Sequence, residues 1–308
     1  MPAKGLLFFN HSSGATFGDT EREKLRSLAE QAHVSFIQVT PELSVPSLVR
    51  EAISKGTKLF IAAGGDGTVN HVAQALVGTD ATLAVIPLGT YNHFARDAGV
   101  PIEWEEALEV ALGSESAKLD VAKVNDRYFL NNISLGLYPD AVRRREEKGR
   151  HYPRWRATLY AGYMTLRHWR STTIALEIPP DTVRHSSGDV RGHLEAFKTH
   201  LLMVSNNAYD LSRFGMHAPR TDLRAGLLTV YWLPKMRRLR FIRFIARYLR
   251  GTAEELAGLR SLQTTQLSLH TPHPRVRVGL DGEVITFHSP LLVTIVPGGL
   301  TVKTAESS

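Results

Sequence analysis

The stretch "IAAGGDGTVNHVAQAL", residues 61–76, decides the fold of the first part of this chain. It begins with a short apolar run, passes through three glycines around Asp66, and continues with apolar residues at helical spacing. From Val69 onward these residues follow the i, i+3, i+4, i+7, i+8 pattern of a helix that buries one face. The stretch therefore predicts a strand, a glycine-rich turn and a helix, which is the repeating unit of a parallel sheet covered by helices.

The residues before this stretch show the same alternation. Short apolar runs and helical patterns follow one another in the order 5–10, 20–32, 34–39, 46–56 and 58–65. Thr20 and Glu23 have the spacing of a capping box, and Pro46 suits the first turn of a helix. We therefore predict an α/β N-terminal domain with a parallel sheet over residues 1–128.

The second part of the chain has a different sequence pattern. Short runs rich in β-branched and aromatic residues follow one another: "STTIALEI", "HLLMVSN", "LLTVYWL", "TQLSLH", "RVRVGLDGE" and "LLVTIVPG". Such runs, separated by turn residues, predict an antiparallel β-sandwich. We expect this C-terminal domain to cover residues 129–308, and we leave open that the extreme C-terminus returns to the first domain.

Length and composition limit the possible classes of protein. A chain of 308 residues with 43% apolar residues can build two hydrophobic cores. It has no apolar run long enough to span a membrane, and its N-terminal apolar run is too short for a signal peptide, so we expect a cytoplasmic location. The absence of cysteine excludes thiol nucleophiles and cysteine-based zinc sites. No G-x-S-x-G elbow is present, which argues against a serine hydrolase.

The charge of the chain indicates anionic partners. The formal net charge is +7 and the pI is about 9.7. Seven Lys or Arg occur between Lys235 and Arg250 without one acid, and a helical projection places four of them on one face: Arg240, Arg243, Arg247 and Arg250. We expect peripheral contact with an anionic membrane surface and no nucleic-acid partner, while a simply solvated basic face stays open. A monomer and a homodimer both stay open.

The glycines around Asp66 suit a phosphate group. Without a Cβ they let backbone amides approach phosphate oxygens, and the following helix adds the positive end of its dipole. A carboxylate at this place is repelled by phosphates unless a divalent cation lies between them or the carboxylate accepts a proton. Both conditions indicate phosphoryl transfer, and the alternative is that Asp66 only caps the helix.

Several motifs together resemble a known family. "GGDGTVNHV" and "PLGTYNHFAR" resemble the diacylglycerol kinase catalytic domain family, which includes bacterial lipid kinases and the sphingosine kinases. "FFNHSSG", "FLNNISLG" and "LDGE" resemble three further motifs of that family, in the same order along the chain. A lone G-G-D-G would be less specific, because NAD kinases and phosphofructokinases share it.

The resemblance implies a function and a set of site residues. It implies a lipid kinase that uses ATP and Mg²⁺ to phosphorylate the hydroxyl of a lipid such as diacylglycerol or a sphingoid base. The catalytic positions it implies are Glu283, as the base, with Asp66 and Asp120. The nucleotide-contact positions it implies are Asn10, Thr40, Gly64, Gly65, Asp66, Gly67, Thr68, Val69, Asn70, Thr90 and Arg96.

Two departures from the family pattern leave alternatives open. Tyr91 and His93 stand where the family usually has a small residue and an acid. In "DLRAGLL", Asp222 matches the first aspartate of a structural magnesium site, but Ala225 replaces the second, so we expect this metal site to be weak. The alternatives are a soluble kinase similar to the NAD kinases and a catalytically weakened lipid-binding or regulatory protein.

Overall fold

The computed structural model describes residues 4–10, 17–136, 167, 171–186, 195–208, 222–240, 242–243 and 260–305. The chain divides into two compact units. The N-terminal unit comprises residues 1–121, 223–225 and 296–308, and the C-terminal unit comprises residues 122–222 and 226–295. Within the described residues, no helix is both long and apolar enough to cross a membrane.

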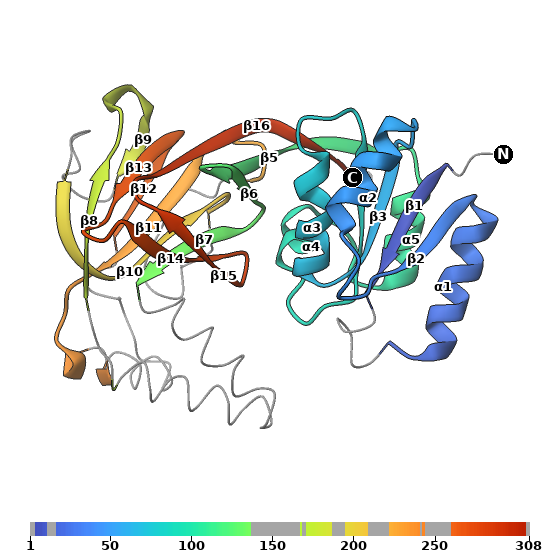
Figure 1. The fold of residues 1–308 in the computed structure, drawn as a ribbon, viewed down its shortest axis with the longest axis horizontal. Helices are drawn as coiled ribbons and strands as arrows, with labels where there is room; N and C mark the ends of the chain where they lie inside the picture. The colour runs from blue at the N-terminus through green and yellow to red at the C-terminus, as the bar shows by residue number, and fades with distance from the viewer. Residues whose placement is uncertain are drawn as a thin grey trace. The chain divides into compact units, whose positions relative to one another are not determined.

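The N-terminal unit is a parallel sheet flanked by helices (Figure 1). Its four main strands lie in the order β4-β3-β1-β2, and each neighbouring pair is parallel. The strands are β1 (Gly5–Phe9), β2 (Val34–Gln38), β3 (Leu59–Gly64) and β4 (Thr82–Pro87). The helices are α1 (Asp19–Gln31), α2 (Val45–Ser54), α3 (Asp66–Leu76), α4 (His93–Asp97) and α5 (Trp104–Leu112).

The predicted periodicity explains the packing of these elements. In α3 the apolar residues at helical spacing are buried, among them Val72 and Leu76, which have no exposed surface. Pro46 lies in the first turn of α2, as predicted. The capping box at Thr20 and Glu23 is wrong: α1 begins at Asp19 with Gly18 as its N-cap residue, and no side chain caps it.

The C-terminal unit consists of strands joined mainly by antiparallel pairs. Its strands run in the order β15-β14-β7-β10-β8-β13-β16, with β11, β12 and β9 attached beyond β10. Their bounds are β6 (Arg127–Phe129), β7 (Asn132–Gly136), β8 (Thr172–Glu177), β9 (Val183–Ser186), β10 (Glu195–Ser205), β11 (Leu228–Pro234), β12 (Arg260–Thr264), β13 (Gln266–His270), β14 (Arg275–Leu280) and β15 (Glu283–His288). A short 3₁₀ helix, η2 (Pro180–Thr182), precedes β9.

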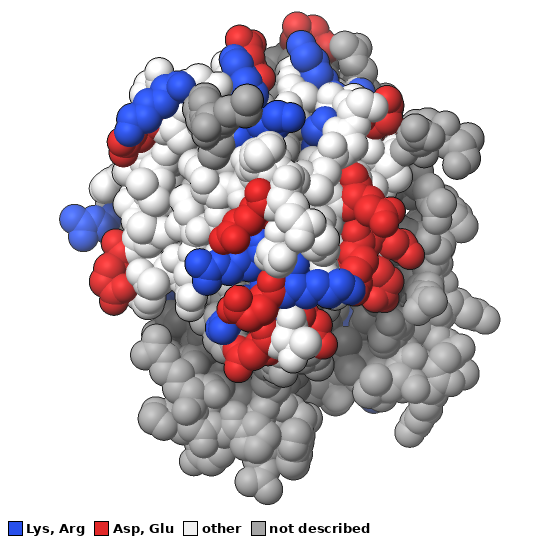
Figure 2. Space-filling model, turned by 90° about the vertical axis from the view of Figure 1, so that its right-hand side faces the viewer, with Lys and Arg blue, Asp and Glu red and all other residues white. Residues whose placement is uncertain are grey.

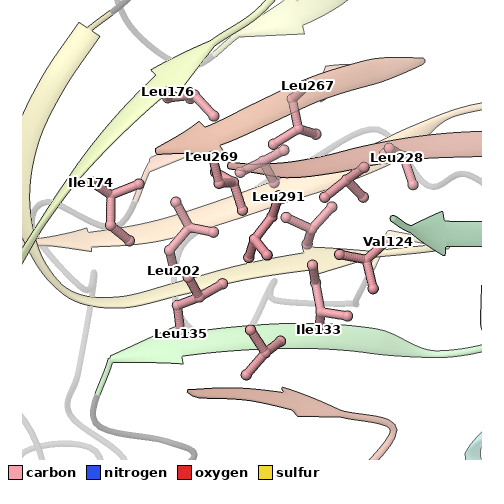
Figure 3. Packing of buried hydrophobic residues seen from close by; sticks show 14 of the residues in the cluster. Val124, Ile133, Leu135, Ile174, Leu176, Leu202, Leu228, Leu267, Leu269 and Leu291 are labelled. Carbon is pink, nitrogen blue, oxygen red and sulfur yellow. The ribbon is translucent and has the colours of Figure 1, made fainter. Parts of the chain in front are cut away.

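One apolar core lies between the layers of this unit. In Figure 3 the side chains of Leu267 and Leu269, from β13, point toward those of Leu202 and Leu135, from β10 and β7. All four are almost completely buried. In β7, β8, β10, β13 and β14, residues at alternate positions fill this core, which is the period-2 pattern expected for a strand with one buried face. The predicted combination of an α/β domain with a parallel sheet and an antiparallel β-sandwich is confirmed.

Two strands have residues in both units. Strand β5 (Ser116–Val124) contributes to the N-terminal unit up to Val121. Strand β16 (Leu291–Lys303) pairs with β13 through its first residues and in parallel with β4 through Thr301 and Val302. The last part of the chain therefore completes the sheet that its first part begins.

Candidate active site

The carboxyl edge of the parallel sheet gathers most of the candidate nucleotide residues. Parallel strands end at the same edge of a sheet, which is where α/β proteins bind ligands. Asn10 follows β1, Thr40 follows β2, Gly64 ends β3, and Thr90 follows β4. The register confirms the alignment, because Gly64 pairs with Pro87 at the last position of β3 and β4.

The two glycine turns after β3 and β4 lie against each other. A Cβ built on Gly89 would lie 2.5 Å from the Cα of Gly65, so no side chain fits there. Asn92, which has a left-handed φ of 50°, accepts a hydrogen bond from the Gly89 N–H at 2.9 Å and donates to the carbonyls of Gly89 and Pro87. Backbone contact and one buried amide side chain therefore fix the relative position of the turns.

Asp66 connects the same two turns. It is the first residue of α3, and the N-cap residue is Gly65, so the interpretation of Asp66 as a helix cap is wrong. Instead, its Oδ1 accepts a hydrogen bond from the Phe94 N–H at 3.3 Å. Its other oxygen makes no hydrogen bond with the residues that the structure describes. One carboxylate oxygen thus holds the second turn, and the other is available beside the helix N-terminus.

The start of α3 fits a phosphate group. A Cβ on Gly67 would meet no atom within 4 Å, and Gly67 is exposed, so its backbone faces open space. Beside it, Thr68 is buried and its hydroxyl accepts a hydrogen bond from Asn10 Nδ2 at 3.0 Å. Asn70 is also buried and accepts a hydrogen bond from Gln74. An open glycine backbone at a helix N-terminus, on a rigid base, suits the phosphates of ATP.

The remaining candidate nucleotide-contact residues lie near the carboxyl edge of the parallel sheet and differ in how exposed they are. Val69 is buried in the face of α3 that packs on the sheet. Thr40 is exposed; a hydrogen bond from the backbone of Glu42 and a second from the Thr40 hydroxyl lower the pKa of the Glu42 carboxyl. Arg96 is exposed, and its Nε donates to the Tyr91 carbonyl at 3.3 Å.

The two unusual residues of the second turn form a pair. The rings of Tyr91 and His93 are stacked, with centroids 5.6 Å apart and planes within 9°. Tyr91 is 56% exposed, and His93 is also exposed. The imidazole ring at the position of the expected acid therefore stacks on the ring at the position of the expected small residue.

Asp120 is buried in the N-terminal unit. Its Oδ1 accepts a hydrogen bond from the Gly298 N–H at 2.8 Å, and its own N–H donates to the Leu223 carbonyl at 2.6 Å. It is 4% exposed. These bonds join three segments that are far apart in sequence, so Asp120 has a structural role whatever else it does.

Glu283 lies at the tip of the β14–β15 hairpin in the C-terminal unit. It is the first residue of β15, pairs with Leu280, and is exposed. Strand β15 is the last strand of the sheet, so Glu283 also lies at a sheet edge. A carboxylate at an exposed hairpin tip is accessible to a bulky acceptor.

The predicted magnesium position has only part of a ligand set. Asp222 and Ala225 are both exposed. Among the described residues, no group of three or more His, Cys, Asp or Glu side chains gathers closely enough to hold a metal ion. At the glycine turns, Asp66 is a carboxylate that could bind a magnesium ion.

A polar cluster in the C-terminal unit was not singled out from the sequence. It joins the "FLNNIS" segment, the "VSNN" segment and the hairpin aspartate Asp281. A sequence signal was present, since D-G between two strand patterns favours a two-residue hairpin. Its partners could not be found this way, because they lie about 150 residues earlier in the chain.

Two family models match the chain. Residues 4–124 match the diacylglycerol kinase catalytic domain, and residues 136–304 match the YegS C-terminal NAD kinase beta sandwich-like domain. The second match alone covers more than half of the chain.

Related sequences and solved structures agree with these matches. A "Probable lipid kinase YegS-like" from Enterobacter sp. (strain 638) is 35% identical over 138 residues, 43% of this chain and 46% of that protein. A protein of the same description from Serratia proteamaculans (strain 568) is 39% identical over 142 residues, 44% of this chain and 46% of that protein. The chain thus spans less than half the length of these relatives. The crystal structure of a diacylglycerol kinase from Bacillus anthracis str. Sterne has 23% identity and a TM-score of 0.70 over 99% of this chain and 98% of that one, which shows the common fold.

Proposed function

Because this chain belongs to the family that joins a diacylglycerol kinase catalytic domain to a YegS C-terminal NAD kinase beta sandwich-like domain, we propose that it is a lipid kinase. In this proposal it transfers the γ-phosphoryl group of ATP to the hydroxyl of a lipid such as diacylglycerol or a sphingoid base. The observation that carries the proposal is the open glycine backbone at the start of α3, with Asp66 beside it.

The residues of the N-terminal unit would bind and orient the phosphates. The amides at the start of α3 and the backbone of Gly67 would donate to phosphate oxygens, and no side chain obstructs them. ATP would supply the phosphoryl group, and its Mg²⁺ would reduce the charge that the nucleophile must approach. Asp66 would attract that cation through the oxygen that does not bind Phe94.

In the C-terminal unit, Glu283 would act on the acceptor. Its carboxylate would accept the proton of the lipid hydroxyl as the oxygen bonds to phosphorus and ADP leaves. An exposed position at a hairpin tip allows an acceptor with long chains to approach. Positioned base catalysis contributes about 10² to 10⁴ in rate.

A transfer assay with labelled ATP tests the proposal. The acceptors are diacylglycerol, a sphingoid base, a total lipid extract and NAD, so that a soluble kinase of the NAD kinase type is detected as well. We expect label in lipid only. Glu283→Gln should lose most of this transfer and the acidic limb of its pH profile, whereas Thr286→Ala, an exposed change in the same strand, should behave like the parent. Label in NAD alone, or Glu283→Gln at the parent rate, would contradict the proposal.

The Tyr91–His93 stack favours a second candidate function. At the second glycine turn, His93 replaces an acid of the family pattern and stacks on Tyr91, and Ala225 replaces another acid. A lipid-binding protein that transfers phosphate only weakly would keep its binding function despite these two changes. This candidate predicts no measurable label in any acceptor of the transfer assay, while a separate vesicle-binding measurement detects lipid binding by the parent protein.

The proposal includes peripheral contact with an anionic membrane from the cytoplasmic side. On the face of the N-terminal unit shown in Figure 2, basic and acidic side chains are interspersed. In this unit, helix α1 has the ion pairs Arg22–Asp19 and Arg26–Glu30, both at 3.1 Å. The segment from Lys235 to Arg243 instead has exposed basic residues beside exposed Leu239 and Ile242, which suits an interface with lipid. Phe241 and residues 244–250 of this predicted helix, with Arg247 and Arg250, lie outside the described residues.

A further inference from the structure

The tip of the β14–β15 hairpin directs a carboxylate into the protein. Asp281 and Gly282 form a two-residue turn with φ angles of 46° and 93°, the type in which both residues are left-handed. The Asp281 carboxylate accepts hydrogen bonds from three consecutive backbone N–H groups, those of Leu130 at 2.8 Å and of Asn131 and Asn132 at 2.9 Å each. A two-residue hairpin turn forms without any of these three hydrogen bonds, so the carboxylate has a role beyond the turn.

The same three residues are held through their carbonyl groups. The Leu130 carbonyl accepts from Asn206 Nδ2 at 3.1 Å, and the Asn131 carbonyl accepts from the Asn206 N–H at 2.9 Å and the Ser205 hydroxyl at 3.1 Å. The Asn132 carbonyl accepts from the N–H of Asp281 at 3.0 Å. Every backbone polar group from Leu130 to Asn132 therefore has a partner, which makes this segment rigid.

The side-chain oxygen of Asn131, inside this frame, has no hydrogen-bond partner among the described residues. Asn131 is 6% exposed, and among the described residues its Oδ1 accepts no hydrogen bond. A buried acceptor without a donor costs about 1–3 kcal/mol. The backbone around Asn131 is held in place while its side-chain oxygen makes no hydrogen bond, and a ligand that donates a hydrogen bond would explain this arrangement.

The frame is continuous with Glu283. In the register of the sheet, Glu283 lies opposite Leu280, and Leu280 lies opposite Ile133, which follows Asn132 in β7. The turn that carries the Asp281 carboxylate leads within two residues to the Glu283 carboxylate. Any displacement of Asp281 from the three amides therefore shifts Glu283 relative to Asn131.

We propose that Asp281 is a positioning residue for the acceptor: its carboxylate fixes the Leu130–Asn132 segment so that the Asn131 carboxamide can bind the polar head of the lipid beside Glu283. This inference rests on the proposed kinase function. Asp281 does not touch the reacting atoms. It acts through the backbone of Asn131 and through the hairpin of Glu283.

The first test is Asp281→Asn. Asparagine tolerates the left-handed φ, so the turn is kept, but one acceptor oxygen becomes an NH₂ donor that faces an amide donor. We expect kcat with lipid to fall about ten-fold or more, while KM for ATP changes less than about two-fold. Hydrogen exchange of the Leu130, Asn131 and Asn132 amides should accelerate about ten-fold or more, because their acceptor is weakened.

The matched control is Asn125→Gly. Asn125 has a φ of 52°, and its Oδ1 accepts the Leu292 N–H at 2.8 Å, so it is another side chain that fixes a left-handed turn in the same unit. Glycine keeps the turn and removes the bond. The control should lower the melting temperature and leave kcat unchanged. Faster exchange in Asp281→Asn together with the parent kcat would overturn the positioning role, and unchanged exchange at residues 130–132 would overturn the clamp.

Asn131→Ala gives a second test that does not depend on the folding of Asp281→Asn. Removal of a buried oxygen that has no partner should leave stability equal or higher. The positioning proposal predicts a fall in kcat, or a rise in KM for the lipid, in this equally stable protein. Parent kinetics in Asn131→Ala would overturn it. A parent protein that labels no lipid would instead contradict the proposed function, and the exchange experiment would still decide whether Asp281 clamps residues 130–132.

Discussion

Asp66 accepts a backbone N–H of the neighbouring turn with one carboxylate oxygen, and its other oxygen makes no hydrogen bond with the described residues at the start of α3. Asp66→Asn keeps an oxygen that can accept from Phe94, so folding stability should change by less than about 1 kcal/mol. The negative charge is lost, and the transfer rate should fall about 10² or more, because the cation at the phosphates loses its carboxylate. Melting temperature and transfer rate, measured on the same protein, check this. A near-parental rate would leave Asp66 a purely structural link between the turns.

Gly67 should be dispensable for folding and necessary for nucleotide binding. Its φ lies outside the left-handed region, and a Cβ there would meet nothing within 4 Å. Gly67→Ala should therefore raise stability by about 0.4–1 kcal/mol, because alanine is the better helix residue. The same methyl group would occupy the space where a phosphate approaches the backbone, so ATP affinity should fall. Urea unfolding and ATP titration separate the two effects.

Gly89→Ala provides the opposite case. Its Cβ would lie 2.5 Å from the Cα of Gly65, so we expect lower stability as well as weaker ATP binding. If Gly67→Ala bound ATP as tightly as the parent protein, our assignment of the phosphate site to the start of α3 would be wrong.

At this scale the sequence predicts residue types better than partners. The glycines around Asp66 could be assigned to a strand-to-helix turn from the local pattern alone, and the structure agrees. The bond from Phe94 to Asp66 could not be predicted, because it depends on how two separate turns meet. Asp281 was noticed only as part of a motif, for the same reason: its three donors lie in another strand connection.

Among the elements, the strands were the most predictable. Each apolar run quoted from the sequence corresponds to a strand, since side chains that alternate or form short apolar blocks have few other stable solutions. Strands β5, β6, β7, β9, β12 and β15 were not predicted as strands, because their partners in the sheet rather than a local pattern define them. The motif glycine Gly136 shows what local patterns leave out: with φ at 96°, its Cβ would lie 2.3 Å from the His200 carbonyl oxygen of the neighbouring strand.

The segment from Lys235 to Arg243 is the element for which membrane contact can be measured. We expect Arg240→Gln with Arg243→Gln to weaken binding to vesicles of phosphatidylglycerol and phosphatidylcholine in equal parts by about ten-fold or more, since a basic residue near an anionic surface contributes about 1 kcal/mol. Leu239→Ser with Ile242→Ser should weaken vesicle binding more than the arginine variant does at high salt, because salt screens the charges and leaves the apolar contacts with lipid as the main contribution. Sedimentation with vesicles at two salt concentrations measures both.

Leu292→Ser is the control for this experiment. Leu292 is 44% exposed, like Ile242 at 38%, but it lies in β16, away from this basic run in sequence. The control should bind like the parent. If the arginine variant also bound like the parent at low salt, the basic residues would be solvated and have no part in docking.

At the scale of the whole molecule, the N-terminal unit depends on the end of the chain. Residues 296–303 lie in that unit: Thr301 and Val302 pair with Thr82 and Leu83 of β4, and the Gly298 N–H binds Asp120. Val302 has no exposed surface. No local pattern in the first 128 residues shows that their sheet is incomplete, because its last strand is about 170 residues away.

Val302→Ala should therefore destabilise the N-terminal unit, although the residue lies six positions from the C-terminus. Removal of two buried methyl groups costs about 1–3 kcal/mol. Hydrogen exchange should accelerate first in β4 and β3, and the strands of the C-terminal core should keep their protection. Leu292→Ala, at an exposed position in the first part of the same strand, should change neither. If Val302→Ala accelerated exchange only in the C-terminal unit, β16 would belong to that unit alone. If it accelerated exchange equally everywhere, the two units would unfold as one cooperative structure, and the chain would have no smaller folding unit than the whole.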